Sequence, residues 1–230
     1  MKKVFPHLHN FRDFCGYRCV DGAVLRGNVF ARSDNPRFVD AEEIKILRDR
    51  GFTTVIDLRR DYEPKDRPDL LAESEGFDYH LIPMYTDPYS SMGNLTTPDT
   101  IVAFFMEKLV ASAPCISAVF RLFATAPNGV LFHCESGKDR TGLIAALLLL
   151  LCGVKEETII EDYRLSYDNL YRGADPELLS DPVMIPMAET MSRFLSRFQE
   201  RYSDPCEYFY LLGITEAEIR QIRYKIKENR

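Results

Sequence analysis

Residues 129–142 read Gly129-Val130-Leu131-Phe132-His133-Cys134-Glu135-Ser136-Gly137-Lys138-Asp139-Arg140-Thr141-Gly142. The apolar run 130–132 predicts a short buried strand, and the apolar segment 143–152 predicts a buried helix. Seven residues, from Cys134 to Arg140, connect these two elements. The chain therefore passes from a strand into a helix through a tight turn that is rich in polar residues.

This turn has the composition of an anion-binding loop. The backbone N–H groups of residues 135–140 and the positive end of the helix dipole can converge on one point. Gly137 permits a backbone conformation that a side chain would hinder. Arg140 offers a planar fork of donors for two oxygens of one phosphoryl group. Because Cys134 lies at the base of this loop, where a positive field stabilises a thiolate, the pattern indicates phosphoryl transfer to sulfur.

The remaining loop residues fit the same chemistry. Glu135, Ser136 and Gly137 contribute backbone N–H groups, and Lys138 adds a positive charge at the rim for an anionic group of the substrate. The hydroxyl of Thr141 can hydrogen-bond the sulfur and help it to leave a phosphocysteine. Asp139 can act as a general acid or can orient Arg140, and the residues alone leave both roles open.

Three motifs resemble a known family. Cys-x5-Arg-Thr is similar to the signature of the cysteine-dependent protein tyrosine phosphatase superfamily. Its form here, His-Cys-x-x-Gly-Lys-Asp-Arg-Thr-Gly, resembles the bacterial and fungal branch of atypical tyrosine or dual-specificity phosphatases, some of which also act on phosphoinositides. Residues 10–17, Asn-Phe-Arg-Asp-Phe-Cys-Gly-Tyr, resemble that branch's opening motif and depart from it at Phe14 and Cys15. Residues 55–59, Val-Ile-Asp-Leu-Arg, followed by Glu63, are similar to a third family segment.

The resemblance covers nearly the whole chain and implies a phosphomonoester hydrolase that works through a phosphocysteine intermediate, without a metal or other cofactor. A protein tyrosine or dual-specificity phosphatase, acting on a phosphorylated protein, is the function it favours. A phosphoinositide or inositol phosphate phosphatase is the alternative, because inositol phosphates suit a broad positive pocket. The residues that keep this alternative open are Lys138, Arg12, Arg59 and Arg60.

Three aspartates are candidates for the acid that protonates the leaving oxygen. Asp139 lies in the loop itself. Asp57 follows a predicted strand, at the sheet edge where ligands bind in open α/β folds, but it can equally pair with Arg12 or Arg59. Asp87 lies in the polar segment 84–98, a candidate lid because long irregular loops are uncommon without a function.

Two rival functions come from other classes. A non-catalytic module that binds a phosphorylated ligand would keep the loop and lose Cys134 or Arg140, yet both are present. A thiol redox or sulfur-transfer enzyme would not require Arg140 together with Thr141. Arg12 and Arg32 can contact the substrate or brace the loop from behind, and bracing is the commoner role.

Composition indicates which classes of partner and which cellular compartment to expect. A net charge of −6, with no basic run, argues against nucleic acid. The longest apolar run is about half of the ~20 residues that a bilayer span needs, so we expect no membrane insertion and a cytoplasmic protein. The six cysteines show no zinc-like spacing and are interpreted as free thiols. The histidines His7, His9 and His80 are scattered along the chain, so we expect no metal site.

The order of elements predicts an α/β fold. A chain of 230 residues suffices for one well-buried core, and we expect a single tyrosine-phosphatase-like domain over residues 1–230. Strands alternate with helices and are followed by helices alone, which predicts a central, mostly parallel sheet flanked by helices, with a helical C-terminal layer. The expected strands are 24–31, 52–58, 77–83 and 130–132. The expected helices are 41–50, 97–112, 116–125, 143–152, 156–166, 187–202, 206–212 and 215–227.

Overall fold

The computed structural model describes residues 4–84, 97–171 and 188–227. Within them one five-stranded sheet forms, in the spatial order β1-β2-β5-β3-β4. Its strands are β1 (Arg12–Asp13), β2 (Phe30–Ser33), β3 (Phe52–Asp57), β4 (Asp78–Leu81) and β5 (Gly129–His133). Only β1 pairs antiparallel with its neighbour, so the prediction of a mostly parallel sheet is confirmed.

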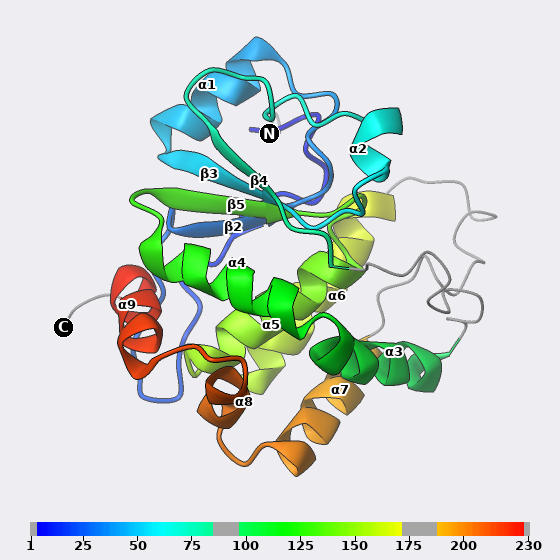
Figure 1. The fold of residues 1–230 in the computed structure, drawn as a ribbon, viewed down its shortest axis with the longest axis vertical. Coiled ribbons are helices and arrows are strands. Elements are labelled where there is room, and N and C mark those ends of the chain that lie inside the picture. Colours follow the sequence, from blue (N-terminus) through cyan, green and yellow to red (C-terminus); the bar gives the residue numbers. More distant parts are fainter. Residues whose placement is uncertain (1–3, 85–96, 172–187, 228–230) are drawn as a thin grey trace.

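Helices cover both faces of this sheet (Figure 1). They are α1 (Ala41–Asp49), α2 (Glu63–Asp66), α3 (Pro98–Ala111), α4 (Ala113–Thr125), α5 (Asp139–Leu151), α6 (Glu156–Tyr171), α7 (Ala188–Arg201), α8 (Pro205–Leu211) and α9 (Glu216–Ile226). α1 lies on one side of the sheet, whereas α4 and α5 lie on the other with the C-terminal helices beyond them (Figure 1).

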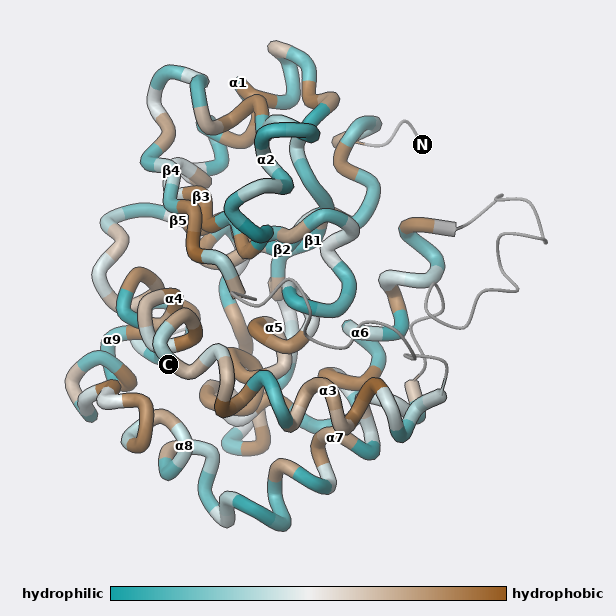
Figure 2. The backbone as a smooth tube through the Cα atoms, turned by 45° about the vertical axis from the view of Figure 1, so that its right-hand side comes forward, coloured by the Kyte–Doolittle hydropathy of each residue, from teal (hydrophilic) through white to brown (hydrophobic). Residues whose placement is uncertain are grey.

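The sheet separates two apolar clusters. In β5, Leu131 faces the smaller cluster under α1, while Val130 and Phe132 face the larger one. This alternation follows from the two-residue period of a strand. Residues 141–151 of α5 are all buried, and Figure 2 shows hydrophobic stretches along β3 and β5 as well as along the surrounding helices. A strand and a helix that are apolar on all sides thus form the centre of the molecule, and they hold the loop between them in place.

Helix caps were predictable because their signals are local. Asp40 and Glu43 form a capping box at the start of α1, and Thr215 and Glu218 form a capping box at the start of α9. Thr97 caps α3, as its position before Pro98 suggests.

Several boundaries differ from the prediction. α5 begins at Asp139, earlier than the apolar pattern indicates, because the loop has already turned at Gly137. Of the strand expected over residues 24–31, only the end joins the sheet, since Asn28 has a positive φ of 60° that breaks the extended chain. Between β3 and β4, where no helix is expected, the chain forms α2, which has Glu63 at its first position.

The candidate lid with Asp87 lies almost wholly outside the described residues. Across the ranges given above, no single helix is long and apolar enough to span a bilayer. α3 and α4 meet that test only together, and they are bent by 76° relative to each other.

Candidate active site

Cys134 directly follows β5, the central strand of the sheet. Its side chain is buried, with 2% of the residue exposed. The strand register places Ser33 of β2 and Asp57 of β3 beside His133, so the ends of three parallel strands meet around the cysteine. This is the edge of an open α/β sheet at which ligands bind.

The loop after Cys134 leaves backbone donors available. Gly137 has a φ of +66°, and a Cβ atom there would lie 2.2 Å from the carbonyl oxygen of Ser33, so no larger residue fits without displacing β2. No described residue accepts a hydrogen bond from the N–H groups of Glu135, Ser136, Gly137 or Asp139. These four N–H groups lie next to the positive end of the α5 dipole.

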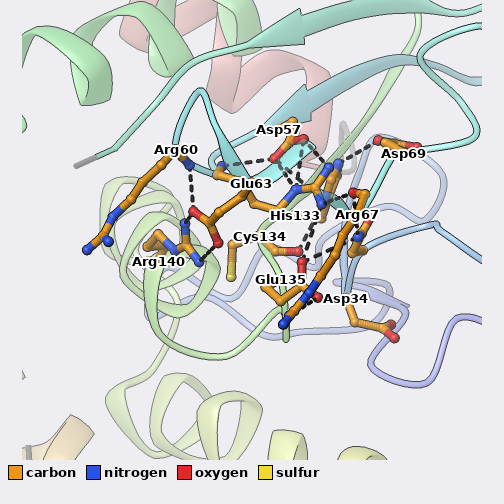
Figure 3. Close-up of polar contacts among 12 residues, drawn as sticks. Asp34, Asp57, Arg60, Glu63, Arg67, Asp69, His133, Cys134, Glu135 and Arg140 are labelled. Atoms are coloured by element: carbon orange, nitrogen blue, oxygen red, sulfur yellow. Dashed lines mark hydrogen bonds and ion pairs between the residues drawn. The ribbon is translucent and has the colours of Figure 1, made fainter. Parts of the chain in front are cut away.

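Arg140 lies in the first turn of α5 and pairs with Glu63. Its Nη1 and Nη2 donate to the two carboxylate oxygens of Glu63 at 2.7 and 3.0 Å (Figure 3). Burial raises the pKa of Glu63, but the hydrogen bonds and charge of Arg140 outweigh burial and hold that pKa below its ordinary value. A pocket of about 290 Å³ lies beside this pair, lined by Arg60, Tyr62, Glu63, Asp66, Arg67 and Arg140.

Asp57, the last residue of β3, forms an ion pair with Arg59, which follows it in the chain by two residues. Its carboxylate accepts hydrogen bonds from Nε and Nη2 of Arg59, and from the hydroxyl of Tyr79 at 2.7 Å. Both Asp57 and Arg59 are fully buried. Burial raises the pKa of Asp57, yet His133 and Arg59 together hold it below its usual range. The carboxylate is thus ionised and saturated with donors.

His133 links this buried group to Cys134. Its Nδ1 lies 3.2 Å from the carbonyl oxygen of Cys134, and its Nε2 lies 2.9 Å from Oδ2 of Asp69. Burial lowers the pKa of His133, but the negative charges of Asp57 and Asp69 overcome that effect and raise the pKa to about 9. The imidazole is therefore protonated at neutral pH, and it forms an ion pair with Asp69.

Two side-chain clusters in the described residues have the makeup of metal ligands. In the buried one, Asp57 already accepts from Arg59, and His133 carries a proton on each nitrogen. In the other, the carboxylate of Glu43 accepts from the backbone of His7 and Asp40. Neither donor set fits a metal ion.

Asp139 lies next to Arg140 and is partly exposed, at 29% of its side chain. Its Oδ1 accepts a hydrogen bond from the hydroxyl of Tyr163 at 3.0 Å, and its Oδ2 lies 3.5 Å from Nζ of Lys138. Lys138, expected as a mobile charge at the rim, has only 4% of its side chain exposed. Of the two described candidates for the proton donor, Asp139 is the more accessible.

The other predicted loop residues occupy distinct places. The side chain of Glu135 turns away to pair with Arg67 at 2.8 Å and with Arg59 at 3.3 Å. The carbonyl oxygen of Ser136 accepts a hydrogen bond from Asn10. The hydroxyl of Thr141 is buried and has no hydrogen-bond partner among the described residues, so the expected bond to sulfur is not formed in this state.

The arginines considered as substrate contacts separate into two groups. Arg12 and Arg32 both pair with Asp162, at 2.8 and 2.6 Å, behind the loop. Arg59 is committed to Asp57, whereas Arg60 lines the pocket beside Arg140.

Sequence reasoning missed Asp69 and Tyr163, which lie far along the chain from the residues they orient. The sequence analysis names Glu63 only as part of a motif and assigns it no contact with Arg140. The one sequence signal for this contact is an acidic residue shortly after Arg59.

Comparison with known proteins identifies the family of this chain. The model of the tyrosine phosphatase family matches residues 3–228. A tyrosine-protein phosphatase of Nostoc commune is 31% identical over 222 residues, which cover 88% of this chain and 75% of the relative. The triple specificity protein phosphatase PtpB of Mycobacterium tuberculosis is 27% identical over 274 residues, covering 96% of this chain and 97% of the relative. The chain belongs to the tyrosine phosphatase family, which confirms the resemblance seen in its motifs.

Proposed function

We propose that this protein is a cysteine-dependent phosphatase that hydrolyses phosphotyrosine, or phosphotyrosine and phosphoserine or phosphothreonine, in proteins. The observation that carries the proposal is the position of Cys134 at the end of the central strand, below a loop that ends in Arg140. In this loop no described residue accepts a hydrogen bond from the N–H groups of Glu135, Ser136, Gly137 or Asp139. A nucleophile, an anion site and a guanidinium fork occur together within seven residues.

In the first step the thiolate of Cys134 attacks phosphorus, and the bond from phosphorus to the leaving oxygen breaks. Arg140 and the loop amides hold the three equatorial oxygens, where charge accumulates in the transition state. The two hydrogen bonds that Glu63 accepts hold the guanidinium of Arg140 in one orientation. A carboxylic acid transfers its proton to the leaving oxygen, so that a neutral alcohol or phenol departs.

In the second step water attacks the phosphocysteine. The carboxylate formed in the first step accepts a proton from this water, the bond from sulfur to phosphorus breaks, and inorganic phosphate and thiolate result. The hydroxyl of Thr141, buried in the first turn of α5, assists by donating to the departing sulfur.

We assign the acid role to Asp139 rather than to Asp57. A general acid must reach the ester oxygen and must exchange protons with solvent. Asp139 is partly exposed beside Arg140, whereas Asp57 is fully buried and already accepts from Arg59 and Tyr79.

A phosphorylated protein is the favoured substrate. The pocket beside Arg140 has the exposed ring of Tyr62 on its wall, a surface on which an aromatic ring can stack. The broad positive pocket that an inositol phosphate prefers is less well supported, because Arg12 and Arg59 are committed to buried carboxylates.

The test is phosphate release from four substrate classes, with chelator and a thiol reductant present. The substrates are phosphotyrosine peptides, phosphoserine peptides, phosphoinositides and soluble inositol phosphates. The proteins are wild type, Cys134→Ser, and the matched control Cys115→Ser, whose thiol lies elsewhere and donates to the carbonyl of Pro83.

Turnover by wild type and Cys115→Ser but not by Cys134→Ser supports the mechanism, and the preferred substrate class identifies the activity. Equal turnover by Cys134→Ser contradicts the mechanism. Binding of phosphopeptide without turnover by wild type favours the binding module instead.

Two further expectations belong with this proposal. A catalytic thiolate requires reducing conditions, which supports a cytoplasmic location. A family match over residues 3–228 supports a single domain, and limited proteolysis would test it.

A further inference from the structure

Three successive carbonyl groups of the loop are held from behind by two side chains. Nδ2 of Asn10 donates to the carbonyl oxygens of Ser136 and Gly137, both at 3.0 Å. Nη2 of Arg32 donates to the carbonyl oxygens of Gly137 at 2.7 Å and Lys138 at 3.3 Å. Asn10 lies in the opening motif, which the catalytic steps do not use.

These contacts fix the direction of the loop amides. In a trans peptide group the carbonyl oxygen and the N–H point in opposite directions. The three carbonyls point toward Asn10 and Arg32, so the N–H groups of Gly137, Lys138 and Asp139 point away from them. An anion cradle needs this arrangement, because a flipped peptide would present an oxygen to the phosphate.

The amide of Asn10 is itself oriented. Its Oδ1 accepts a hydrogen bond from Nη1 of Arg12 at 2.5 Å, which leaves Nδ2 facing the loop. Arg12 in turn donates from Nε to Asp162 of α6 at 2.8 Å. Since only the nitrogen end of the Asn10 amide can donate to a carbonyl, the guanidinium of Arg12 determines which end faces the loop.

Asp162 connects the two arginines. It accepts from Nη1 of Arg32 at 2.6 Å and from the hydroxyl of Tyr17 at 3.0 Å, with only 2% of its side chain exposed. Arg12 and Arg32 are directly opposed in the β1·β2 pair, so the short antiparallel strand brings both guanidinium groups to Asp162. The backbone N–H of Asn10 donates to Oδ1 of Asp34 at 2.9 Å, which adds to its fixed position behind the loop.

Arg32 also contributes charge. Burial and the nearby Arg12 lower its pKa to about 10, so it remains protonated at neutral pH. Two guanidinium groups share one carboxylate here, and this leaves an excess positive charge behind the loop. A cation that donates to a carbonyl polarises the peptide group and makes the N–H on its other side a stronger donor.

We propose that Asn10 and Arg32, aligned by Arg12 and Asp162, are positioning residues that keep the N–H groups of Gly137, Lys138 and Asp139 directed at the substrate phosphate. The inference rests on the proposed function, because it assumes that phosphate binds in this loop. It assigns the opening motif a role in catalysis through the loop rather than through contact with the substrate.

The test uses Asn10→Asp, which keeps the size of the side chain but replaces the donor with an oxygen that repels the carbonyls. A second variant, Arg12→Lys, keeps the charge and removes the fork that orients Asn10. The matched control is Tyr208→Phe, which removes a buried hydrogen bond to the carbonyl of Leu109 remote from the loop. Each variant is made twice: with Cys134 for kcat and KM, and with Cys134→Ser for calorimetric binding of inorganic phosphate. Thermal unfolding is recorded for all of them.

We expect Asn10→Asp to lower kcat about 100-fold, as loss of an oxyanion donor does, and to weaken phosphate binding. Arg12→Lys should shift both quantities in the same direction by a smaller factor, and Tyr208→Phe should shift neither even where it lowers the unfolding temperature.

Folded Asn10→Asp with wild-type kcat and phosphate affinity overturns the inference while leaving the phosphatase mechanism intact. If Asn10→Asp does not fold, Arg12→Lys decides in the same way. A wild-type protein without turnover or phosphate binding overturns the proposed function itself.

Discussion

Glu63 receives one hydrogen bond from each terminal nitrogen of Arg140, at 2.7 and 3.0 Å, across 77 positions of sequence. The side chains are 19% and 13% exposed, so water screens the pair only weakly. The backbone N–H of Arg60 donates to the same carboxylate at 2.7 Å, which ties the side chain of Glu63 to the segment just before α2. The arginine that we propose to bind phosphate is therefore held by an element outside the loop that carries Cys134.

Replacing Glu63 with Gln should lower kcat/KM for phosphotyrosine peptides by roughly 10- to 100-fold, because a guanidinium that is slightly misplaced binds the transition state poorly. Steady-state kinetics measure the effect. The control is Glu161→Gln, which removes a carboxylate that also accepts two hydrogen bonds from an arginine, but at the exposed surface. Equal kinetics for the two variants would contradict the assigned role of Glu63.

Asp139→Asn should lower kcat by about 100-fold or more for phosphotyrosine, since general acid catalysis contributes 10²–10⁴-fold. The loss should be much smaller for p-nitrophenyl phosphate, whose leaving phenolate is more stable and needs less protonation. Comparison of the two substrates measures the effect. The same loss with both substrates would indicate that Asp139 orients Arg140 instead.

Asp57→Asn should lower the free energy of unfolding. Removing one partner of a buried ion pair leaves Arg59 uncompensated and costs about 3–5 kcal/mol of the free energy of unfolding. Denaturant unfolding measures this loss. A stable Asp57→Asn variant with the leaving-group dependence expected of Asp139→Asn would restore Asp57 as the acid.

Tyr163→Phe should lower kcat roughly fivefold with little change in KM, because one hydrogen bond to Asp139 worth about 1 kcal/mol is lost. The ring of Tyr163 packs closely against Gly142, where a Cβ atom would lie 2.8 Å from it. Tyr163→Phe keeps this contact and removes only the hydroxyl. Tyr208→Phe again serves as the control. The role of Tyr163 would be refuted by a kcat ratio between the two variants near one.

The His133–Asp69 pair should make stability depend on pH. The pKa of His133 is 6.5 in the unfolded chain and about 9 in the folded protein. Because the folded value is the higher one, the stabilisation is complete below pH 6.5 and is lost as the pH rises through 9. Asp69→Asn should remove part of this dependence.

Denaturant unfolding of wild type and Asp69→Asn from pH 6 to pH 10 measures the difference between their free energies of unfolding. It should be largest at low pH and shrink toward pH 9. A difference that stays constant over this range would show that His133 does not titrate as stated.

Local patterns in the sequence specified much of the fold and the centre of the site. The apolar run of β5 and the apolar segment of α5 are contiguous, and so are the seven residues between them. Cap signals such as Asp40 with Glu43 also act within one helical turn. Prediction failed where a local pattern was overridden, as at Asn28, whose positive φ ends an otherwise plausible strand.

The sequence by itself pointed to the proposed nucleophile, the proposed phosphate-binding arginine and the glycine of the loop, because their chemistry depends on neighbours within a few residues. The tertiary structure alone decided which aspartate is accessible, which side chain holds Arg140, and what orients the loop carbonyls. Those answers depend on strand order and on the packing of α2 and α6 against the sheet edge. Contacts such as Arg12 with Asp162 join residues 150 positions apart, and they form only once the core has fixed the relative positions of these elements.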